Sequence, residues 1–304
     1  MKPPFSIRHW LCLLGLCALL TGTARAQLTI LPLGDSITYG FVSFANSDYP
    51  AGDPSSAGYR YQLYQDLGGS TTDVTFLGSN SSNGNASLGQ PTLPASETAN
   101  EGHNGYTIEG VDAELNGNGN NQSGRDGDNN GGYWITGGNG TGRSAINPQV
   151  VLLNVGTNDA TDDEGDGLSN AVNASNMDTY MVQLMGNLKT DLPNAQIFVG
   201  NLTPREDNTQ AEQIEALFNA ALPAEVAAEG SNFHFVDLYD AVPTSDIDAD
   251  GGYQHPDIAG YQAEGNAWDT ALVDAGVVPE PSTYTLMGVS ALLLGVVARR
   301  RRLA

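Results

Sequence analysis

The feature that most constrains the fold is an alternation of short apolar runs with longer segments of helical period. The clearest run, residues 149–155, is nearly continuous in Val and Leu, as in strands covered on both faces. Other strand-length runs are residues 27–33, 73–78, 196–202 and 233–238, and helical periods occur at residues 59–67, 171–192, 208–229 and 255–275. This alternation predicts one α/β domain with a central parallel sheet of about five strands.

Residues 79–144 interrupt this alternation. They are crowded with Gly and Asn, above all in the runs at residues 116–121, 129–132 and 137–140. A segment of this composition buries little apolar surface, so it cannot contribute much to a core. We therefore predict long surface loops here, around one short ordered piece near residues 101–115.

The charge of the chain argues against one class of partner. It has 35 acidic residues against 12 Lys and Arg, with a formal net charge of −23. Most of the basic residues lie near the two ends, and those between residues 27 and 278 are Arg60, Arg125, Arg143, Lys189 and Arg205. Because so acidic a body repels phosphate backbones along almost any face, no nucleic-acid partner is expected.

The first 26 residues have the three parts of a secretory signal peptide. A charged head is followed by an apolar stretch at residues 10–20 and by a small-residue cleavage pattern at residues 24–26. The apolar stretch is shorter than the about 20 residues that span a bilayer, which argues against a retained helix. Both cysteines, Cys12 and Cys17, lie in this leader, so we expect the exported protein to contain no disulfide.

Residues 279–304 form a second processing signal. Pro-Glu-Pro at residues 279–281 precedes a mostly apolar run at residues 284–298 and four consecutive arginines. This order resembles the PEP-CTERM sorting tail of Gram-negative bacteria, which implies handling by an exosortase-type machinery. The resemblance implies secretion across the inner membrane, to the cell surface, the periplasm or an extracellular matrix. The alternative is a permanent transmembrane anchor, and both place the body outside the inner membrane.

Two polar blocks directly follow predicted strands. Residues 34–36, Gly-Asp-Ser, follow the first strand, and residues 156–159, Gly-Thr-Asn-Asp, follow the strand rich in Val and Leu. Doubly wound folds open their clefts at these strand ends. There Ser36 can serve as a nucleophile, and the Asn158 amide can donate to an oxyanion. Taken alone, each block is also typical of a turn or a helix cap.

Two further residues complete a candidate site for ester hydrolysis. Gly105 can offer a backbone N–H where a side chain would obstruct a substrate, and His255, just before the last helical segment, can act as a base. Of the other histidines, His103 is a candidate for the rim of the cleft. His234 alternates with phenylalanines in a predicted strand, which indicates a structural role.

Together these blocks resemble the SGNH (GDSL-type) hydrolase family, over about residues 28–275. The resemblance implies a flavodoxin-like three-layer α/β/α sandwich over residues 27–278 and a serine esterase that works through an acyl-enzyme. It implies that Ser36 is the nucleophile and His255 the base. It also implies that the Ser36 and Gly105 N–H groups and the Asn158 amide hold the oxyanion.

A second, narrower resemblance concerns the substrate. Residues 59–64 and 74–79 are similar to the branch that contains acetylxylan esterases and related carbohydrate deacetylases. An O-acetylated polysaccharide is therefore the expected substrate, with a lipid or short-chain ester as the alternative. A non-catalytic surface or biofilm-matrix protein on the same fold is the competing class. The presence of Ser36, Asn158 and His255 together argues against it.

The chain departs from the family in its catalytic carboxylate. The family has Asp three residues before the base, where this chain has Gly252. A triad needs a carboxylate on the far imidazole nitrogen. We expect Asp250 to fill this role if the loop bulges, with Asp248 as the next candidate. A backbone carbonyl is the alternative partner of His255.

The same loop also has the spacing of a calcium-binding loop. Asp246, Asp248 and Asp250 alternate, and Asp257 occupies the twelfth place, where a bidentate carboxylate is expected. The Asp at that place and the lack of a helix-loop-helix context favour a solvated acidic loop without metal. The two assignments of Asp250 compete, because a calcium ligand could not freely orient His255.

Overall fold

The computed structural model describes residues 27–42, 56–70, 73–84, 86, 90–115, 133–137, 144–163, 165–207, 209–249 and 252–278. The predicted signal peptide (residues 1–26), the sorting tail (residues 279–304) and most of the Gly/Asn runs lie outside these residues. Within the described part of the chain, no helix is both long and apolar enough to cross a membrane. The apolar run at residues 284–298 lies outside that part.

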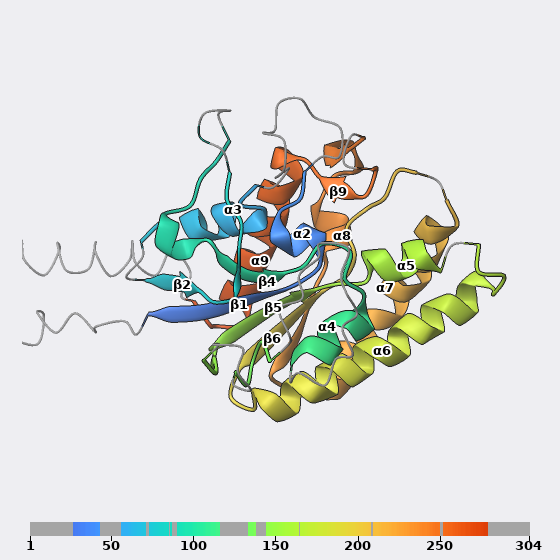
Figure 1. The fold of residues 1–304 in the computed structure, drawn as a ribbon, viewed down its shortest axis with the longest axis horizontal. Helices are drawn as coiled ribbons and strands as arrows, with labels where there is room; N and C mark the ends of the chain where they lie inside the picture. The colour runs from blue at the N-terminus through green and yellow to red at the C-terminus, as the bar shows by residue number, and fades with distance from the viewer. Residues whose placement is uncertain are drawn as a thin grey trace, which may run out of the picture. The chain divides into compact units, whose positions relative to one another are not determined.

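A mostly parallel sheet forms the centre of the unit Gln27–Ala275 (Figure 1). It has seven strands in the order β3-β4-β1-β5-β6-β7, with β2 paired to β1. The strands are β1 (Leu28–Gly34), β2 (Val74–Phe76), β3 (Asn80–Ser81), β4 (Ala99–Gly102), β5 (Val150–Asn154), β6 (Gln196–Gly200) and β7 (Phe233–Val236). The five predicted strands are all present. They could be predicted because strands inside a parallel sheet form nearly continuous apolar runs in the sequence.

Helices cover both faces of this sheet. Figure 1 shows α4, α6 and α7 on one face and α3 and α9 on the other. The helices of the described chain are α2 (Ser36–Tyr39), α3 (Tyr59–Asp66), α4 (Ile108–Leu115), α5 (Thr157–Asp162), α6 (Asn170–Asp191), α7 (Gln210–Glu229), α8 (Leu238–Ala241) and α9 (Ile258–Asp274), with short 3₁₀ turns at Ala95–Glu97 and Thr244–Asp246. The predicted α/β/α sandwich is therefore confirmed.

Apolar side chains from both sides of the sheet build the core. On the first face, buried residues of β1 and β5 pack against Ile108 of α4, Met181 of α6 and Phe218 of α7. On the second face, the rings of Tyr59 in α3 and Trp268 in α9 lie 5.8 Å apart between their centroids. Both rings are fully buried, so an apolar contact joins α3 and α9 within this layer.

The prediction for residues 79–144 is wrong in one respect. Two short strands, β3 and β4, lie where only loops and an ordered piece were predicted, and they extend the sheet beyond five strands. β4 pairs in parallel with the end of β1, with Gly102 opposite Gly34, and β3 is antiparallel to β4. Strands this short carry no periodicity of their own, so only their partners define them.

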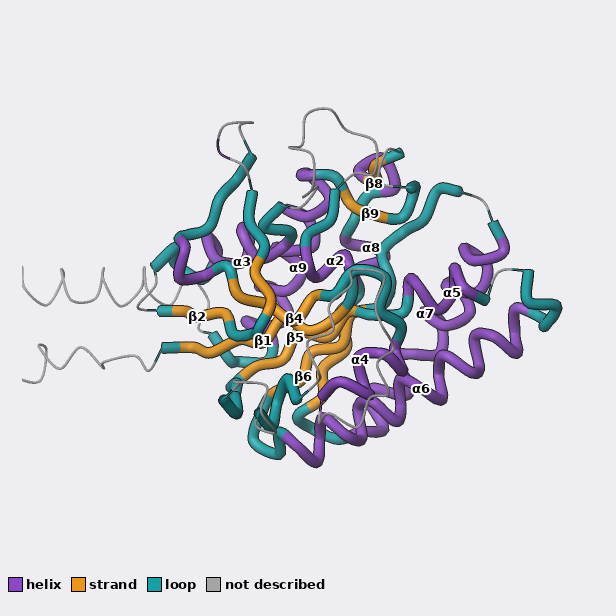
Figure 2. Tube along the Cα trace, viewed as in Figure 1, coloured by secondary structure: helices purple, strands orange, loops and turns teal. Residues whose placement is uncertain are grey.

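The start of the last helical segment also differs from the prediction. α9 begins at Ile258, and His255–Pro256 instead form a short strand, β9, antiparallel to β8 (Ile247–Asp248). Asp257 ends this strand and caps the helix, because its Oδ1 accepts a hydrogen bond from Gly260 N at 2.9 Å. β9 lies beside α2 (Figure 2). This placement brings the C-terminal hairpin to the carboxyl end of β1.

Candidate active site

Ser36 lies where β1 passes into α2. The strand ends at Gly34, where an added Cβ would lie 1.9 Å from Asn154 O on β5, so the close approach of the two strands requires glycine. Asp35 then caps the helix, since its Oδ1 accepts a hydrogen bond from Ile37 N at 2.9 Å. Ser36 is the first residue of α2 and is 5 % exposed.

His255 reaches Ser36 from the other end of the chain. Ser36 Oγ and His255 Nε2 lie 2.8 Å apart, although 219 residues separate them. The imidazole is 2 % exposed, and its ring centroid is 4.6 Å from that of Phe41. This geometry suits proton transfer, because the hydroxyl can donate to the ring nitrogen in a site from which water is largely excluded.

Asn158 and the Gly105 segment meet next to this pair. Asn158 is in the first turn of α5, after Gly156, whose φ of 136° lies in a region that favours glycine. Its Nδ2 donates to Tyr106 O at 2.9 Å, which ties the side chain to the residue after Gly105. Gly105 itself has a φ of 80°. Two of the three predicted oxyanion donors, the Gly105 N–H and the Asn158 amide, therefore lie on segments that are hydrogen-bonded to each other.

The Gly105 segment is also joined to the end of β1. His103 N donates to Gly34 O at 3.1 Å, and Tyr106 N donates to His103 O at 3.2 Å. These bonds place the turn that contains Gly105 beside the turn that contains Ser36. The structure thus gathers Ser36, Gly105, Asn158 and His255 at one edge of the sheet.

His103 is not on the rim of a cleft, so that interpretation is wrong. The residue is fully buried, and its Nε2 lies 2.9 Å from Glu101 Oε2. Its ring stacks on Trp134 with a centroid distance of 4.2 Å and an interplanar angle of 5°. The Glu101 carboxylate also accepts from Ser79 N and Ser79 Oγ, so His103 belongs to a buried support for the Gly105 segment.

His234 has the structural surroundings that its strand position predicted. Its Nε2 contacts Gln196 Oε1 at 2.8 Å, and its ring stacks on Phe198. Burial lowers the pKa of this imidazole, because desolvation disfavours its charged form. It lies on β7, at the edge of the sheet away from β3 and β4.

Two buried carboxyl groups lie around the site. Burial raises the pKa of Asp35 to about 7, although hydrogen bonds from the backbone of Ile37, Gly156 and Thr157 act against the rise. Burial also raises the pKa of Asp159, which accepts from Ile108 N at 3.0 Å through Oδ2. Desolvation dominates in both cases, because a buried carboxylate loses more hydration than a few amide donors replace.

The acidic loop before His255 is described only in part. Asp250 lies outside the described residues, and Asp248 pairs directly with His255 across the β8–β9 hairpin. Gly252 N donates to Ala249 O at 3.2 Å. Within the described residues, no group of three His, Cys, Asp or Glu side chains could hold a metal ion. The Asp257 side chain is occupied as the cap of α9, and Asp246 Oδ1 accepts from Ser245 Oγ.

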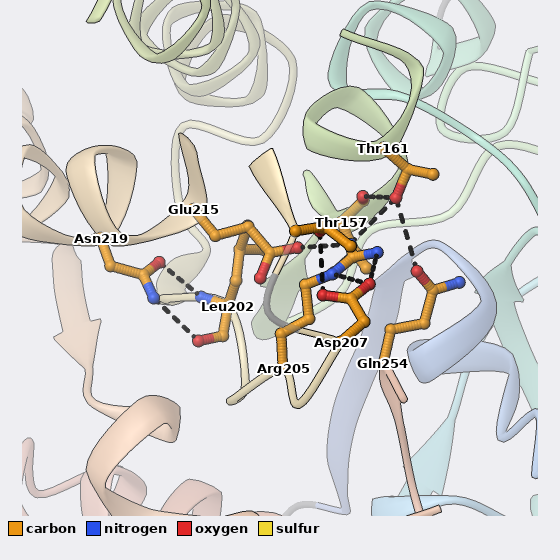
Figure 3. A network of polar contacts seen from close by, with 9 residues as sticks. Thr157, Thr161, Leu202, Arg205, Asp207, Glu215, Asn219 and Gln254 are labelled. Carbon is orange, nitrogen blue, oxygen red and sulfur yellow. Dashed lines mark hydrogen bonds and ion pairs between the residues drawn. The ribbon is translucent and has the colours of Figure 1, made fainter. Parts of the chain in front are cut away.

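A polar network around Arg205 adjoins the site and was not singled out from the sequence. It joins the segment after β6 to α5, to α7 and to the residue before His255 (Figure 3). The one available signal was that Arg205 is among the few basic residues of an acidic body.

Comparisons with known proteins agree with this geometry. The model of the GDSL-like Lipase/Acylhydrolase family matches residues 67–263, and a PEP-CTERM protein-sorting motif matches residues 277–302. A search of curated proteins found no match. The sorting motif indicates export and sorting in a Gram-negative bacterium.

Solved structures with similar folds include several carbohydrate esterases. A Clostridium thermocellum family 3 carbohydrate esterase is 26 % identical with a TM-score of 0.54, and the match covers 82 % of this chain and 96 % of that one. A family 3 carbohydrate esterase from Talaromyces cellulolyticus is 19 % identical with a TM-score of 0.54, over 83 % of this chain and 100 % of that one. The family match spans more than half of the sequence, and this chain belongs to the GDSL-like lipase/acylhydrolase family.

Proposed function

We propose that the protein is a serine esterase that removes O-acyl groups, chiefly O-acetyl, from carbohydrate. The observation that carries this proposal is the buried 2.8 Å contact between Ser36 Oγ and His255 Nε2. A serine hydroxyl becomes nucleophilic when an adjacent base accepts its proton. The family and the structural relatives support an acylhydrolase, and the sugar substrate is the further step.

The reaction proceeds in two halves. His255 Nε2 takes the proton of Ser36 while Oγ attacks the ester carbonyl, and the resulting oxyanion is held by the N–H groups of Ser36 and Gly105 and by Asn158 Nδ2. The intermediate collapses, the sugar hydroxyl leaves with the proton from His255, and the acyl group remains on Ser36. Water, deprotonated by His255, then attacks the acyl carbonyl, the bond from that carbon to Ser36 Oγ breaks, and His255 returns the proton to Oγ as the carboxylic acid leaves.

The third member of the catalytic group is proposed to be Asp250, with Asp248 as the alternative. A carboxylate on the far imidazole nitrogen fixes the tautomer and stabilises the imidazolium. Measurement of kcat for Asp250→Asn and Asp248→Asn separates the two, because only the residue that orients His255 should cost about a hundredfold or more. A calcium role for the same loop instead predicts that a chelator lowers the melting temperature.

The acidic body and one relative support the proposed substrate class. A protein of net charge −23 repels anionic lipid surfaces and not a neutral sugar. The relative with 26 % identity is a carbohydrate esterase. A lipid or short-chain ester is the alternative substrate, and it predicts faster hydrolysis of free alkyl esters than of acetylated glycans.

The decisive experiment compares the protein with Ser36→Ala on p-nitrophenyl acetate. We expect a loss of about a thousandfold or more in kcat for the variant, because the nucleophile is removed. Equal rates for the two proteins would leave only a non-catalytic surface or matrix role. Acetate released from acetylated xylan, compared with other acetylated glycans and with short-chain lipid esters, then identifies the substrate.

The location is proposed to be outside the inner membrane, at the cell surface, in the periplasm or in an extracellular matrix. The sorting motif supports this, as does the predicted leader over residues 1–26. Mass spectrometry of the protein recovered from a Gram-negative host tests it. We expect a product that lacks the leader, and that lacks the tail only where an exosortase is present.

A further inference from the structure

The side chain of Arg205 is the centre of a buried polar network behind the candidate site. Its Nε and Nη2 donate to Asp207 Oδ2 at 2.9 and 2.6 Å, and its Nη1 donates to Glu215 Oε1 at 3.0 Å. The guanidinium is 4 % exposed and Glu215 is 5 % exposed. Two carboxylates on different segments therefore fix the planar group in one orientation (Figure 3).

The chain that carries Arg205 is itself held along its length. Directly after β6, the side chain of Asn201 accepts from Leu238 N at 2.6 Å and donates to Asp237 at 2.9 Å. Asn219 of α7 then binds the backbone of Leu202 twice, since it accepts from N at 2.9 Å and donates to O at 3.0 Å. Hydrogen bonds thus hold the segment at residues 201–207 against α7 and the start of α8.

The segment at residues 201–207 contacts α5, which carries Asn158, and the residues directly before His255. Arg205 Nη1 donates to Thr161 Oγ1 at 3.0 Å, on α5, one turn after Asn158. The single hydroxyl proton of Thr161 is shared between Thr157 O, at 2.9 Å, and Gln254 Oε1, at 3.4 Å, and Gln254 is next to His255. A second contact is independent of these side chains, because Glu206 N donates to Tyr253 O at 3.1 Å.

We propose that residues 201–207 are a brace that sets the distance between Asn158 and His255, with Arg205 and Thr161 as its positioning residues. The inference rests on the proposed function. Asn158 and His255 lie on α5 and β9, and a strand as short as β9 cannot hold its own position. A shift of about 1 Å between a base and an oxyanion donor costs about a hundredfold in rate, so such a support has a direct effect on catalysis.

Thr161→Val is the variant that tests the brace. It removes the hydroxyl between Arg205 and Gln254 and leaves the contacts of Arg205 with Asp207 and Glu215 in place. We expect kcat on p-nitrophenyl acetate to fall about tenfold, with KM changed less than about twofold. Unchanged kcat in an active protein would overturn the proposal.

Thr190→Val is the matched control. Thr190 is an exposed residue of α6 whose Oγ1 donates to Gly186 O at 2.9 Å, and Thr161 Oγ1 makes the same one-turn contact with Thr157 O at 2.9 Å. The chemical change and the lost helix contact are therefore equal. We expect wild-type kcat for this control, and a tenfold loss here would refute the assignment to the brace.

A double-mutant cycle distinguishes positioning from a general loss of structure. If Thr161 acts by placing Asn158 relative to His255, its substitution should cost less than about threefold once Asn158→Ala is present. A purely structural role predicts the same tenfold factor in both backgrounds. Equal factors would therefore contradict the brace even if the single variant is slow.

Amide hydrogen exchange provides a readout that does not need activity. In the full chain, we expect faster exchange at residues 252–256 in Thr161→Val than in the wild type or in Thr190→Val. Unchanged exchange would overturn the brace. Failure of the esterase proposal would look different. The wild type and Ser36→Ala would then hydrolyse the ester at equal rates, and the exchange measurement would still test the brace.

Discussion

Two arginines, Arg205 and Arg60, are buried in the described part of the chain, and their surroundings differ. Arg205 donates to the carboxylates of Asp207 and Glu215. Arg60 is fully buried, and within the described residues it donates to neutral oxygens, which are Thr98 O at 2.9 Å, Tyr39 O at 3.3 Å, and Ser82 O and Oγ at 3.1 and 2.6 Å. Among the residues described, no carboxylate forms an ion pair with Arg60.

The difference appears in the proton affinities of the two groups. Burial lowers the pKa of Arg60 to about 10, because its charge is desolvated and no carboxylate of the described residues pairs with it. The carboxylates of Asp207 and Glu215 raise the pKa of Arg205 in spite of burial. Arg60 thus donates hydrogen bonds to backbone carbonyls of several segments, among them that of Tyr39 at the end of α2. Arg205 acts as a counter-ion that keeps two acidic segments together.

The largest expected effect is on the Arg205 side. Arg205→Met should lower the free energy of unfolding by about 3–5 kcal/mol, because it leaves the buried Glu215 without its partner. Burial raises the pKa of Glu215 to about 8, so urea unfolding at about pH 9, where this carboxyl is ionised, measures the loss. Arg205→Lys keeps the charge but not the planar fork, so it should lose less. A loss below about 1 kcal/mol for the Met variant would remove the distinction between the two arginines.

A pH-dependent effect is expected next, at the start of α2. The pKa of Asp35 is raised from 3.8 to about 7, so wild-type stability from this group is complete below about pH 4 and is lost as the pH rises to about 7. Asp35→Asn keeps a neutral cap and does not ionise. Its unfolding free energy relative to the wild type should therefore increase between pH 4 and 7, by at most about 4 kcal/mol.

Urea titrations of both proteins across this pH range test the Asp35 prediction. Asp159 and Glu264 have raised pKa values to which Asp35 contributes, and most of their own effect cancels in the difference. A difference that stays flat from pH 4 to 8 would show that Asp35 is ionised throughout.

A smaller loss is expected on the Arg60 side. Arg60→Met removes the donors to the carbonyls of Tyr39, Thr98 and Ser82 but also removes a desolvated charge, and the two effects partly offset each other. We expect the free energy of unfolding to fall by about 1–3 kcal/mol, as measured by urea unfolding. A loss larger than that of Arg205→Met would reverse the comparison.

The smallest effect is expected for a basic residue at the surface. Lys189, whose side chain is 50 % exposed, pairs with Glu229 at 3.3 Å between Nζ and Oε2. Lys189→Ala should cost less than about 1 kcal/mol, and added salt should reduce the cost further because exposed ion pairs are screened. Thermal melting at low and high salt measures it, and a salt-independent loss would argue against an ion-pair origin.

Much of this architecture was legible in the sequence. Buried strands such as β5 and long helices such as α6 can be predicted from sequence. A strand buried on both faces is apolar throughout, and a helix buried along one side has apolar residues at helical spacing. Ser36 and Asn158 could be predicted as candidate site residues for a related reason. Both directly follow such strands, and carboxyl ends of parallel strands converge at one edge of the sheet.

The parts that were missed lack such a pattern. β3 and β9 have two residues each, and only a partner strand distinguishes them from loops. The burial of His103 depends on Glu101 and Trp134, which no local spacing connects to it. The network of Arg205 joins segments up to 93 residues apart and leaves no periodic trace in the sequence.

The sequence by itself determined the α/β/α class and the family, along with the identity and order of the candidate catalytic residues, because these depend on patterns within single elements and on motifs at their ends. Tertiary structure alone decided that Ser36 Oγ and His255 Nε2 lie 2.8 Å apart across 219 residues. It also decided which arginine faces carboxylates and which faces carbonyls. The physical reason is that a side chain's partners are set by the packing of distant segments, and that packing is fixed by the summed burial of the whole core and not by any local pattern.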